Sequence, residues 1–396
     1  MKLSRVIAGV AVVALALVGH ERPVPAVGET PATSLAALFD LSRGLARDTN
    51  GDGLADLVAA RVVVAAAPTA GDRDAATNVA ARLGFETTEA RLPVLVRDTD
   101  TLDPAVIPLL VGRQNARVVA LAASKAIDLD ALGPGQGLIA LVASPAGGGP
   151  AVVIAGADDE GTTAAGTQFG ARLPRVWSMT GLTLTAIEQQ IAGFLRTQRI
   201  TAQSTGITSL VVDRDRRGIA RVVARVSVPA ADGRRALDAF AQLDRAHRQG
   251  REPQTLNFAN AAEVAIDLVA GSASVGRATV ARAGLNPRTL TPPIDPDELA
   301  TDSPGERGRT AEAAAPPSKT FDLTSPYSID GWLGDGYTDL IPDRTEATLV
   351  LGRDADAVNA AHIAARLGLE TTGLTLPMTR AVGRITEPAR ETSPIL

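Results

Sequence analysis

A short acidic segment at residues 48–56 is the part of the sequence best suited to bind a metal ion. Calcium takes about six to eight hard oxygen ligands, and carboxylate or amide side chains at alternate positions of a tight loop converge on one point. Gly53 stands at loop position 6, where such a loop turns sharply. The spacing therefore predicts a calcium site whose ligands, at loop positions 1, 3, 5 and 9, are Asp48, Asn50, Asp52 and Asp56.

Over these nine residues the segment resembles the short calcium loops of dockerin and thrombospondin-type repeats. Loop position 12 is Ala59, where an EF-hand has a bidentate Glu, so we expect weak binding. Extracellular modules bind calcium with dissociation constants of roughly 0.1–1 mM, and a weak site outside the cell would still fill. The alternative is a turn rich in Asp and Asn that caps a strand without any ion.

A second acidic loop lies near the end of the sequence. Its three carboxylates align with Asp48, Asp52 and Asp56, whereas Tyr337 and Leu340 replace the asparagine and the glycine of the first loop. We expect this loop to bind calcium less readily than the first. Its carboxylates are Asp335, Asp339 and Asp343.

Both loops belong to an internal repeat. Residues 80–88 read AARLGFETT and residues 364–372 read AARLGLETT, which indicates a duplication. In each copy the acidic loop leads into a β-branched strand, then into a helix with apolar residues on one face, then into a second extended run. The order strand, helix, strand predicts parallel βαβ units and an α/β fold. The first strands are expected at 57–64 and 347–351, and the helices at 73–83 and 355–367.

Two further segments separate the copies. One has two strands around a turn, then a helix at 233–248 and a third strand, which predicts a small α+β module. The other is rich in proline and polar side chains, which predicts a linker. The expected order is an α/β domain (34–200), the α+β module (205–284), the Pro-rich linker (285–319) and the second copy (320–396).

We expect the second copy to be incomplete. The first copy continues through Pro108-Leu109-Leu110 into further helices and strands, whereas the second reaches Pro394-Ile395-Leu396 at the matching place. An α/β domain interrupted there would leave an unpaired strand edge. The chain is therefore expected to be a fragment of a longer protein. The alternative is a natural half-domain that docks on the first copy.

Residues 1–26 have the pattern of a secretory signal peptide. Lys2 and Arg5 precede an apolar run at residues 6–18, and Val24-Pro25-Ala26 has the small residues of a cleavage site. A helix of that run would reach about 20 Å, less than the roughly 30 Å hydrocarbon core of a bilayer. We expect a secreted or periplasmic protein with no membrane span after signal cleavage.

The segment at residues 152–177 is similar to a recurring unit of secreted carbohydrate-active proteins. Its strand ends in Gly-x-Asp-Asp-x-Gly-Thr and runs into a helix that closes before an aromatic residue. It resembles the non-catalytic α/β domain preceding the catalytic barrel of α-glucuronidase-type and hexosaminidase-type glycoside hydrolases. The resemblance implies a structural element and no catalytic residue. The matching residues are Gly156, Asp158, Asp159, Gly161, Thr162 and Trp177.

Composition excludes several classes of chemistry. The chain has no Cys and only three His, which excludes thiol catalysis and Cys-ligated metal sites and leaves little for His-rich ones. A net charge of −5 argues against a nucleic-acid binder. His247 falls near the end of a predicted helix, where its positive charge would suit the helix dipole.

We therefore expect a secreted, non-catalytic accessory, scaffold or ligand-binding protein with a calcium-stabilised loop. Its expected partner is a polysaccharide or a cell-envelope protein and not nucleic acid, and it would form the N-terminal part of a larger carbohydrate-active protein. Two alternatives stay open: a secreted hydrolase whose active site the motifs do not reveal, and a subunit of a cell-surface assembly.

Overall fold

The computed structural model describes parts of one of the two units into which the chain divides, Pro31–Leu396. The expected signal peptide (1–26) and linker (285–319) lie outside the described residues, as does Trp177. The described residues are 33–89, 91–143, 149–172, 184–213, 218–249, 261–281, 324–329, 331–352, 356–374, 376–381 and 394–395.

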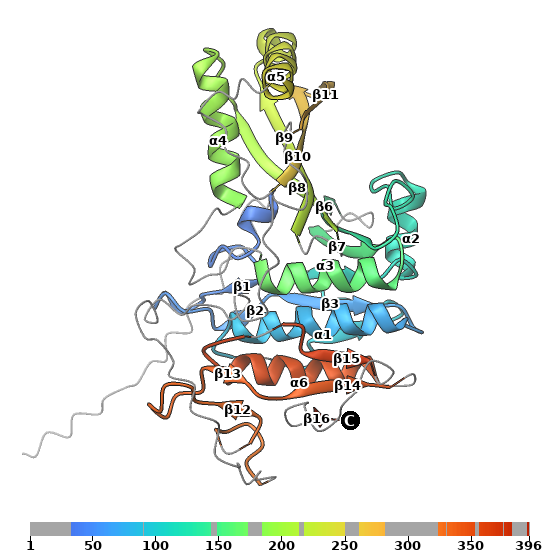
Figure 1. Cartoon of the computed structure of the whole chain (residues 1–396), viewed down its shortest axis with the longest axis vertical. Helices are drawn as coiled ribbons and strands as arrows, with labels where there is room; N and C mark the ends of the chain where they lie inside the picture. Colours follow the sequence, from blue (N-terminus) through green and yellow to red (C-terminus); the bar gives the residue numbers. More distant parts are fainter. Residues whose placement is uncertain are drawn as a thin grey trace, which may run out of the picture. The chain divides into compact units, whose positions relative to one another are not determined.

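A nine-stranded mixed sheet runs through most of the described residues, in the order β11-β10-β9-β8-β6-β7-β5-β3-β4 (Figure 1). In its first half, β3 pairs in parallel with β4 and β5, and β5 with β7, as the βαβ pattern predicts. β6 is antiparallel to both of its neighbours. The chain is thus a mixed α/β protein. The strands of this half are β3 (Ala60–Val64), β4 (Leu95–Arg97), β5 (Ile107–Val111), β6 (Gln136–Ala143) and β7 (Pro150–Gly156).

Successive residues of these strands point to opposite faces of the sheet and pack into different hydrophobic cores. Val62 and Val64 belong to the main core, which includes residues of α1 (Ala70–Phe85) and α3 (Asp159–Arg172). Val63 belongs to a smaller core with residues of α2 (Ala116–Ala123). Because helices cover both faces, the strands read as nearly continuous apolar runs in the sequence.

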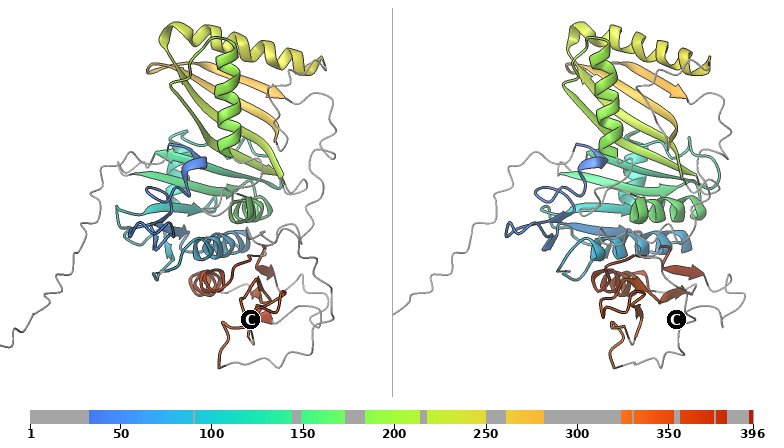
Figure 2. Two further views of the ribbon diagram at one scale, coloured as in Figure 1. Left: turned by 90° about the vertical axis from the view of Figure 1, so that its left-hand side faces the viewer. Right: turned by 60° about the vertical axis from the view of Figure 1, so that its left-hand side comes forward.

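The segment expected as a separate α+β module continues the same sheet. Its first strand, β8 (Ser204–Asp213), pairs with β6, and β9 (Gly218–Val228), β10 (Ala261–Ala270) and β11 (Ala273–Ala281) follow in order. Two helices pack on these strands (Figure 2), α4 (Leu184–Thr197) and α5 (Gly233–Arg248). The ring centres of Phe194 in α4 and Phe240 in α5 lie 5.2 Å apart. A boundary near residue 205 therefore falls within a hydrogen-bonded sheet.

A second small sheet repeats the pairing of β4, β3 and β5. Its order is β15-β14-β16, all parallel, from Thr379–Ala381, Thr348–Leu351 and Pro394–Ile395. Leu349 of β14 pairs with Ile395 as Val62 of β3 pairs with Leu109. The helix between β14 and β15 is α6 (Ala357–Leu369), at the position that α1 holds between β3 and β4.

The helices α1 and α6 lie side by side in reciprocal contact (Figure 1). A Cβ atom on Gly84 of α1 would lie 1.9 Å from the backbone oxygen of Ala365 in α6, and one on Gly368 of α6 would lie 2.1 Å from that of Ala81 in α1. In the AARLG repeats, Gly84 aligns with Gly368 and Ala81 with Ala365. Equivalent residues therefore exchange the same contact, which is the pattern of a two-fold axis.

On its other side α1 packs against α3, again through glycine. A Cβ on Gly166 of α3 would lie 2.5 Å from the Cα atom of Ala75, and one on Gly71 would lie 2.4 Å from the backbone oxygen of Asp159. Enclosed by the sheet and two helices, α1 is buried nearly all round, including Arg82. The expectation of a helix with a single apolar face was wrong for α1, because the repeat supplies α6 as a second helical neighbour.

Candidate functional site

The predicted calcium loop connects two short antiparallel strands, β1 (Ala46–Arg47) and β2 (Leu57–Val58). Asp48 begins it, and its carboxylate accepts hydrogen bonds from the backbone N–H groups of Gly51 (2.5 Å) and Gly53 (2.8 Å). Both glycines have positive φ, 82° and 89°, which only glycine adopts readily. These N–H groups, that of Gly53 most of all, hold the pKa of Asp48 below its ordinary value.

The other predicted ligands also bond within the loop. Asp56 accepts from the backbone N–H of Thr49 (3.0 Å) and from its hydroxyl (2.8 Å). Asn50 Oδ1 accepts from the N–H of Asp52 (2.8 Å), while Asp52 Oδ1 accepts from that of Leu54 (2.8 Å). The part of the chain that the structure describes holds no group of three or more Asp, Glu or His arranged to hold a metal ion. The loop thus has the donor types that calcium prefers, in a conformation that caps itself, and calcium binding stays a prediction.

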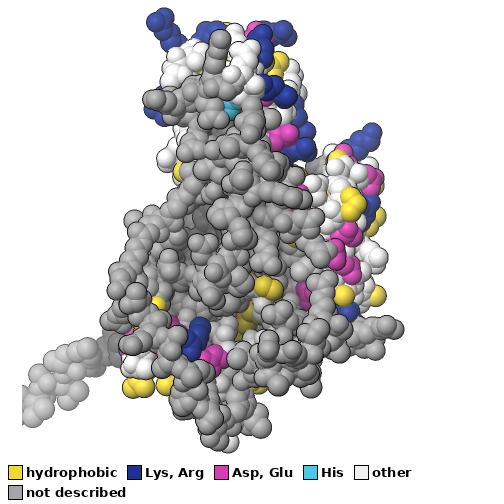
Figure 3. All heavy atoms as spheres, in the orientation of Figure 1, with side chains coloured by type: hydrophobic (Ala, Val, Ile, Leu, Met, Phe, Trp, Pro, Cys, Tyr) yellow, Lys and Arg dark blue, Asp and Glu magenta, His cyan; other side chains and the backbone are white. Residues whose placement is uncertain are grey.

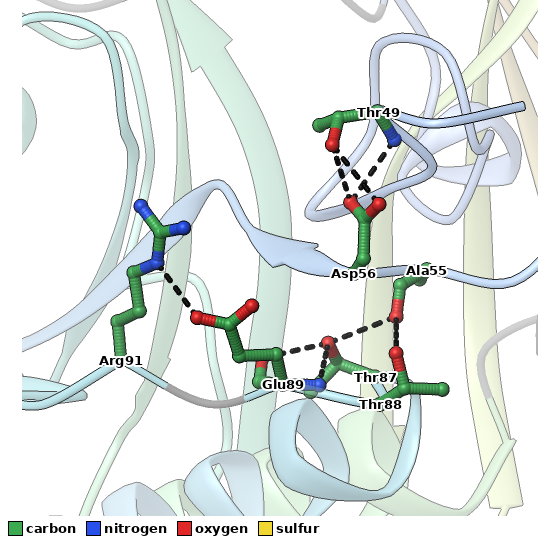
Figure 4. Close-up of polar contacts among 7 residues, drawn as sticks. All are labelled: Thr49, Ala55, Asp56, Thr87, Thr88, Glu89 and Arg91. Atoms are coloured by element: carbon green, nitrogen blue, oxygen red, sulfur yellow. Dashed lines mark hydrogen bonds and ion pairs between the residues drawn. The ribbon is translucent and has the colours of Figure 1, made fainter. Parts of the chain in front are cut away.

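A pair of threonines ties the loop to the end of α1 (Figure 4). The backbone oxygen of Ala55 accepts hydrogen bonds from the hydroxyls of Thr87 and Thr88, each at 3.1 Å, and from the backbone N–H of Thr88 at 2.8 Å. These threonines end the AARLGFETT repeat. Sequence reasoning recognised the repeat but missed this role, which fixes the loop relative to the helix.

The second acidic loop repeats part of this internal hydrogen bonding despite its changed sequence. It lies between β12 (Leu333–Gly334) and β13 (Arg344–Thr345), and Asp335 accepts from the backbone N–H of Leu340 at 2.7 Å. Thr338 and Leu340 have φ of 59° and 67° where the first loop has its two glycines. The backbone oxygen of Pro342 accepts from Thr372 Oγ1 (3.0 Å), as that of Ala55 does from Thr88. The loop therefore keeps its shape without the residues that favour it.

The carboxyl ends of β3, β5 and β7 are the place where α/β sheets usually hold a ligand. Asp72 lies there, only 2% exposed, and forms a capping box with Thr69 at the start of α1. Gly112, with φ of 91°, ends β5 against it, since a Cβ there would lie 2.3 Å from Asp72 Oδ1. Burial, and secondarily the charge of Asp159, raises the pKa of Asp72.

Three more polar side chains near the carboxyl ends of the parallel strands cap helices. Asp158 accepts from the backbone N–H of Gly161 (2.8 Å) at the start of α3, and Asp98 accepts from that of Ala116 (2.7 Å) at the start of α2. Asn115 caps α2 and donates to the backbone oxygen of Val63 (2.9 Å). These contacts give each group a structural partner at the edge where a ligand would be expected.

A fully buried ion pair lies at the other end of α1. Arg82 and Glu86 have no exposed side-chain surface, and Arg82 Nη1 donates to the backbone oxygen of Gly170 in α3 (2.7 Å). The guanidinium also lies 4.9 Å from the centre of the Phe39 ring. Its repeat partner Arg366, paired with Glu370, is exposed.

Arg366 also faces an aromatic ring, as Arg82 faces Phe39, but the ring comes from a different place in the repeat. Arg366 lies 5.7 Å from the ring centre of Tyr327, which in turn meets Trp332 edge-on at 5.3 Å. In the sequence, Phe39-Asp40-Leu41 matches Phe321-Asp322-Leu323, and Phe321 lies outside the described residues. Tyr327, Trp332 and Tyr337 are all half-buried, so the first two serve as packing for each other rather than as an open stacking platform.

The structure corrects one expectation about histidine. His247, expected to carry a positive charge at the end of α5, is 2% exposed, and neither ring nitrogen has a hydrogen-bond partner. The ring therefore packs inside the protein and not at the surface, where the sequence placed it. On α5, Arg234 pairs with Asp238 and Arg248 with Asp244. Figure 3 shows basic and acidic side chains together at the upper end of the molecule, where α5 lies.

No protein-family model matches the chain, and no curated protein matches it significantly. Among the described residues, no helix combines the length and apolar character needed to cross a membrane. The site therefore has to be interpreted from its own geometry.

Proposed function

We propose that the protein is a non-catalytic scaffold, built from two equivalent α/β copies, that holds a ligand or partner outside the cell. The observation that carries the proposal is the reciprocal contact between α1 and α6. Gly84 against Ala365 and Gly368 against Ala81 bring two helix backbones together at repeated positions, as expected when two copies of one unit pack about a two-fold axis.

The polar groups at the strand ends support a positioning role. Asp72, Asp98, Asp158 and Asn115 are the side chains best placed to serve a reaction at the carboxyl ends of the parallel strands. Each bonds instead to the backbone of a helix start or a neighbouring strand. A hydrolase would need a nucleophile, or a pair of acid and base groups, free to reach a substrate.

We also propose that calcium binds the first acidic loop, and the second less readily. Asp48, Asn50, Asp52 and Asp56 would supply carboxylate and amide oxygens, and the ion would rigidify a loop already tied to α1 through Thr87 and Thr88. The secreted or periplasmic location that the N-terminal pattern predicts would provide calcium at the required concentration. The loop would then be a structural clasp rather than a reaction centre.

The proposed ligand is a polysaccharide, on the strength of the resemblance of residues 152–177 to an accessory domain of glycoside hydrolases. The test incubates the full chain with insoluble cellulose, xylan, chitin or cell-wall sacculi, and measures the bound fraction and the release of reducing sugar. We expect retention on at least one polymer with no sugar released. Release of sugar would show a hydrolase and overturn the proposal.

A matched pair of variants connects retention to the loop. Asp48→Ala removes the carboxylate that starts the calcium loop, while Asp238→Ala removes a carboxylate of α5 that pairs with Arg234. Retention is expected to fall with Asp48→Ala or with EDTA and to stay unchanged with Asp238→Ala. Equal retention in every case would show that polymer binding does not depend on the loop.

A specific observation favours the assembly subunit as a second candidate function. Leu92 and Leu376 are equivalent residues of the two copies. Leu92 is 64% exposed, whereas Leu376 is only 2% exposed. We propose that a partner covers Leu92 as α3 covers Leu376.

A further inference from the structure

Among the residues that the structure describes, helix α6 lacks a neighbour that its equivalent α1 has. α3 covers the side of α1 that faces away from α6, but on α6 the matching side carries more exposed side chains than α1 does. We call this surface, together with the leucine beside it, the open α6 face. It consists of Leu92, Asn359, His362, Arg366 and Glu370.

The ion pairs of the two helices show the difference most directly. The side chains of Arg82 and Glu86 are 0% exposed under α3, whereas those of Arg366 and Glu370 are 52% and 31% exposed. Arg82 Nη1 donates to the backbone oxygen of Gly170, which lies near the end of α3. Arg366 can present the same donors to a helix carbonyl that comes to lie on it.

The leucines beside the two helices follow the same pattern. Gly170 lies so close to Leu376 that a Cβ atom on it would be 2.5 Å from Leu376 Cδ1. Leu376 is therefore covered by α3, although it belongs to the second copy. The two-fold axis relates Leu376 to Leu92, so a helix equivalent to α3 would cover Leu92. In the structure Leu92 is 64% exposed.

A third pair completes the comparison. Asn78 is fully buried and its amide donates to Thr167 Oγ1 of α3 at 3.3 Å. His362 stands at the matching position of α6, and its buried Nε2 has no hydrogen-bond partner. The open α6 face thus combines an apolar side chain, an arginine and a half-buried histidine ring, at the positions whose equivalents contact α3.

We propose that the open α6 face binds a strand–helix segment of a partner polypeptide that is built like β7–α3. The inference rests on the equivalence of the two copies proposed above, and not on polysaccharide binding. The strand would add to β16 as β7 adds to β5, where Leu109 pairs with Val152. The helix would lie across α6 as α3 lies across α1.

The chemistry of the partner helix follows from α3. Two glycines four residues apart let its backbone approach α6 and Leu92, as Gly166 and Gly170 do at Ala75 and Leu376. Carbonyl groups near its C-terminus carry partial negative charge, which complements Arg366. A hydroxyl one residue after the first glycine, as Thr167 is, would lie beside the His362 ring.

The first experiment uses a labelled peptide of residues 150–172 as the probe and the full chain as the receptor. Fluorescence anisotropy is expected to show saturable binding, with at least a tenfold loss of affinity in Asn359→Trp, which fills the open α6 face. Val119→Trp adds the same side chain at an exposed position of α2 and is expected to bind as the wild type does. Equal binding to both variants would place the peptide elsewhere and overturn the proposal.

A second experiment does not depend on the peptide folding unaided. The same segment is joined after Leu396 by a flexible linker, which raises its effective concentration to the millimolar range. We expect slower amide hydrogen exchange in α6 than in a chain whose added segment carries valine in place of its two glycines. Equal exchange in the two chains would overturn the proposal.

The unmodified chain tests whether a second copy of the same chain covers the open α6 face instead. Sedimentation of the free chain is expected to give a monomer. A dimer that Asn359→Trp dissociates would assign the open α6 face to a second copy and contradict the partner proposed here. Failure to bind polysaccharide would overturn that part of the proposed function and leave these outcomes unchanged.

Discussion

Arg82 and Glu86 form an ion pair, one helical turn apart on α1, that no solvent reaches. Arg82 is also held by the backbone oxygen of Gly170 in α3 and by the ring of Phe39. Burial lowers the pKa of Arg82, and the charge of Glu86 opposes that shift. Removing one partner would leave the other charge buried and uncompensated, which is among the more costly changes a core can undergo.

We therefore expect Arg82→Ala to lower the free energy of unfolding by about 3–5 kcal/mol. Arg366→Ala is the matched control, because Arg366 pairs with Glu370 in the same way but in contact with solvent. That change should cost about 1 kcal/mol or less. Urea denaturation followed by circular dichroism measures both. Similar losses of stability in the two variants would show that α3 does not shield the Arg82–Glu86 pair from solvent.

The glycines between α1 and α6 give a second prediction. Gly84→Ala and Gly368→Ala each place a methyl group about 2 Å from a backbone oxygen of the other helix, and each should destabilise the protein by about 1–3 kcal/mol. Gly193→Ala, in α4 with nothing within 4 Å, is the control. It should stabilise by roughly 0.5–1 kcal/mol, because alanine favours helix. Thermal melts would refute the close packing if all three variants behaved alike.

The buried carboxyl of Asp72 predicts a pH dependence. Its folded-state pKa is raised, chiefly by burial, so between 3.8 and that raised pKa the folded state binds the proton more tightly than the unfolded state. The free energy of unfolding should therefore fall as pH rises through this window. Asp72→Asn cannot titrate, so its stability relative to the wild type should increase over the same window.

Asp48→Asn, measured in EDTA, is a control for which the expected pH dependence of stability has the opposite sign. Hydrogen bonds from backbone N–H groups lower the pKa of Asp48, so its contribution is present above 3.8 and is lost as pH falls through the lowered pKa. Urea midpoints between pH 3 and 8 compare the two variants. Parallel curves for Asp72→Asn and the wild type would contradict the burial of that carboxyl.

Calcium binding gives a prediction for the acidic loops. Calcium at 1 mM, a concentration typical of weak extracellular sites, should raise the melting temperature relative to EDTA. Asp48→Ala should remove most of that increase, and Asp335→Ala should remove less, because its loop lacks the asparagine and the glycine. Magnesium at the same concentration controls for ionic strength. An unchanged midpoint in wild-type protein would leave a self-capped turn as the full description of the loop.

Local patterns in the sequence carried much of the fold. α5 spans Gly233–Arg248 as predicted, because its apolar spacing and flanking residues are local signals. The hairpin of β8 and β9 likewise follows from alternating residues around a polar turn. The parallel pairing of Pro394-Ile395 with β14 was implied by the match to Pro108-Leu109.

Long-range contacts were harder to predict. Nothing local in α1 indicates that Arg82 would be enclosed, because the enclosing residues come from α3 and from Phe39. The threonines Thr87 and Thr88 read as part of a repeat, and their bond to Ala55 appears only in three dimensions. The sheet continuing from β6 into β8 also depends on a pairing that spacing alone does not encode.

The central claim is that the two copies pack through α1 and α6 into one scaffold. Trp332 lies in the second copy, and the chain's other tryptophan is Trp177, so Trp177→Phe leaves a single fluorescent reporter there. In that background, urea unfolding followed by Trp332 fluorescence and by circular dichroism should give one coincident transition. Adding Gly84→Ala should shift the fluorescence transition to lower urea and separate the two. Coincident curves with an unchanged midpoint after Gly84→Ala would contradict the claim.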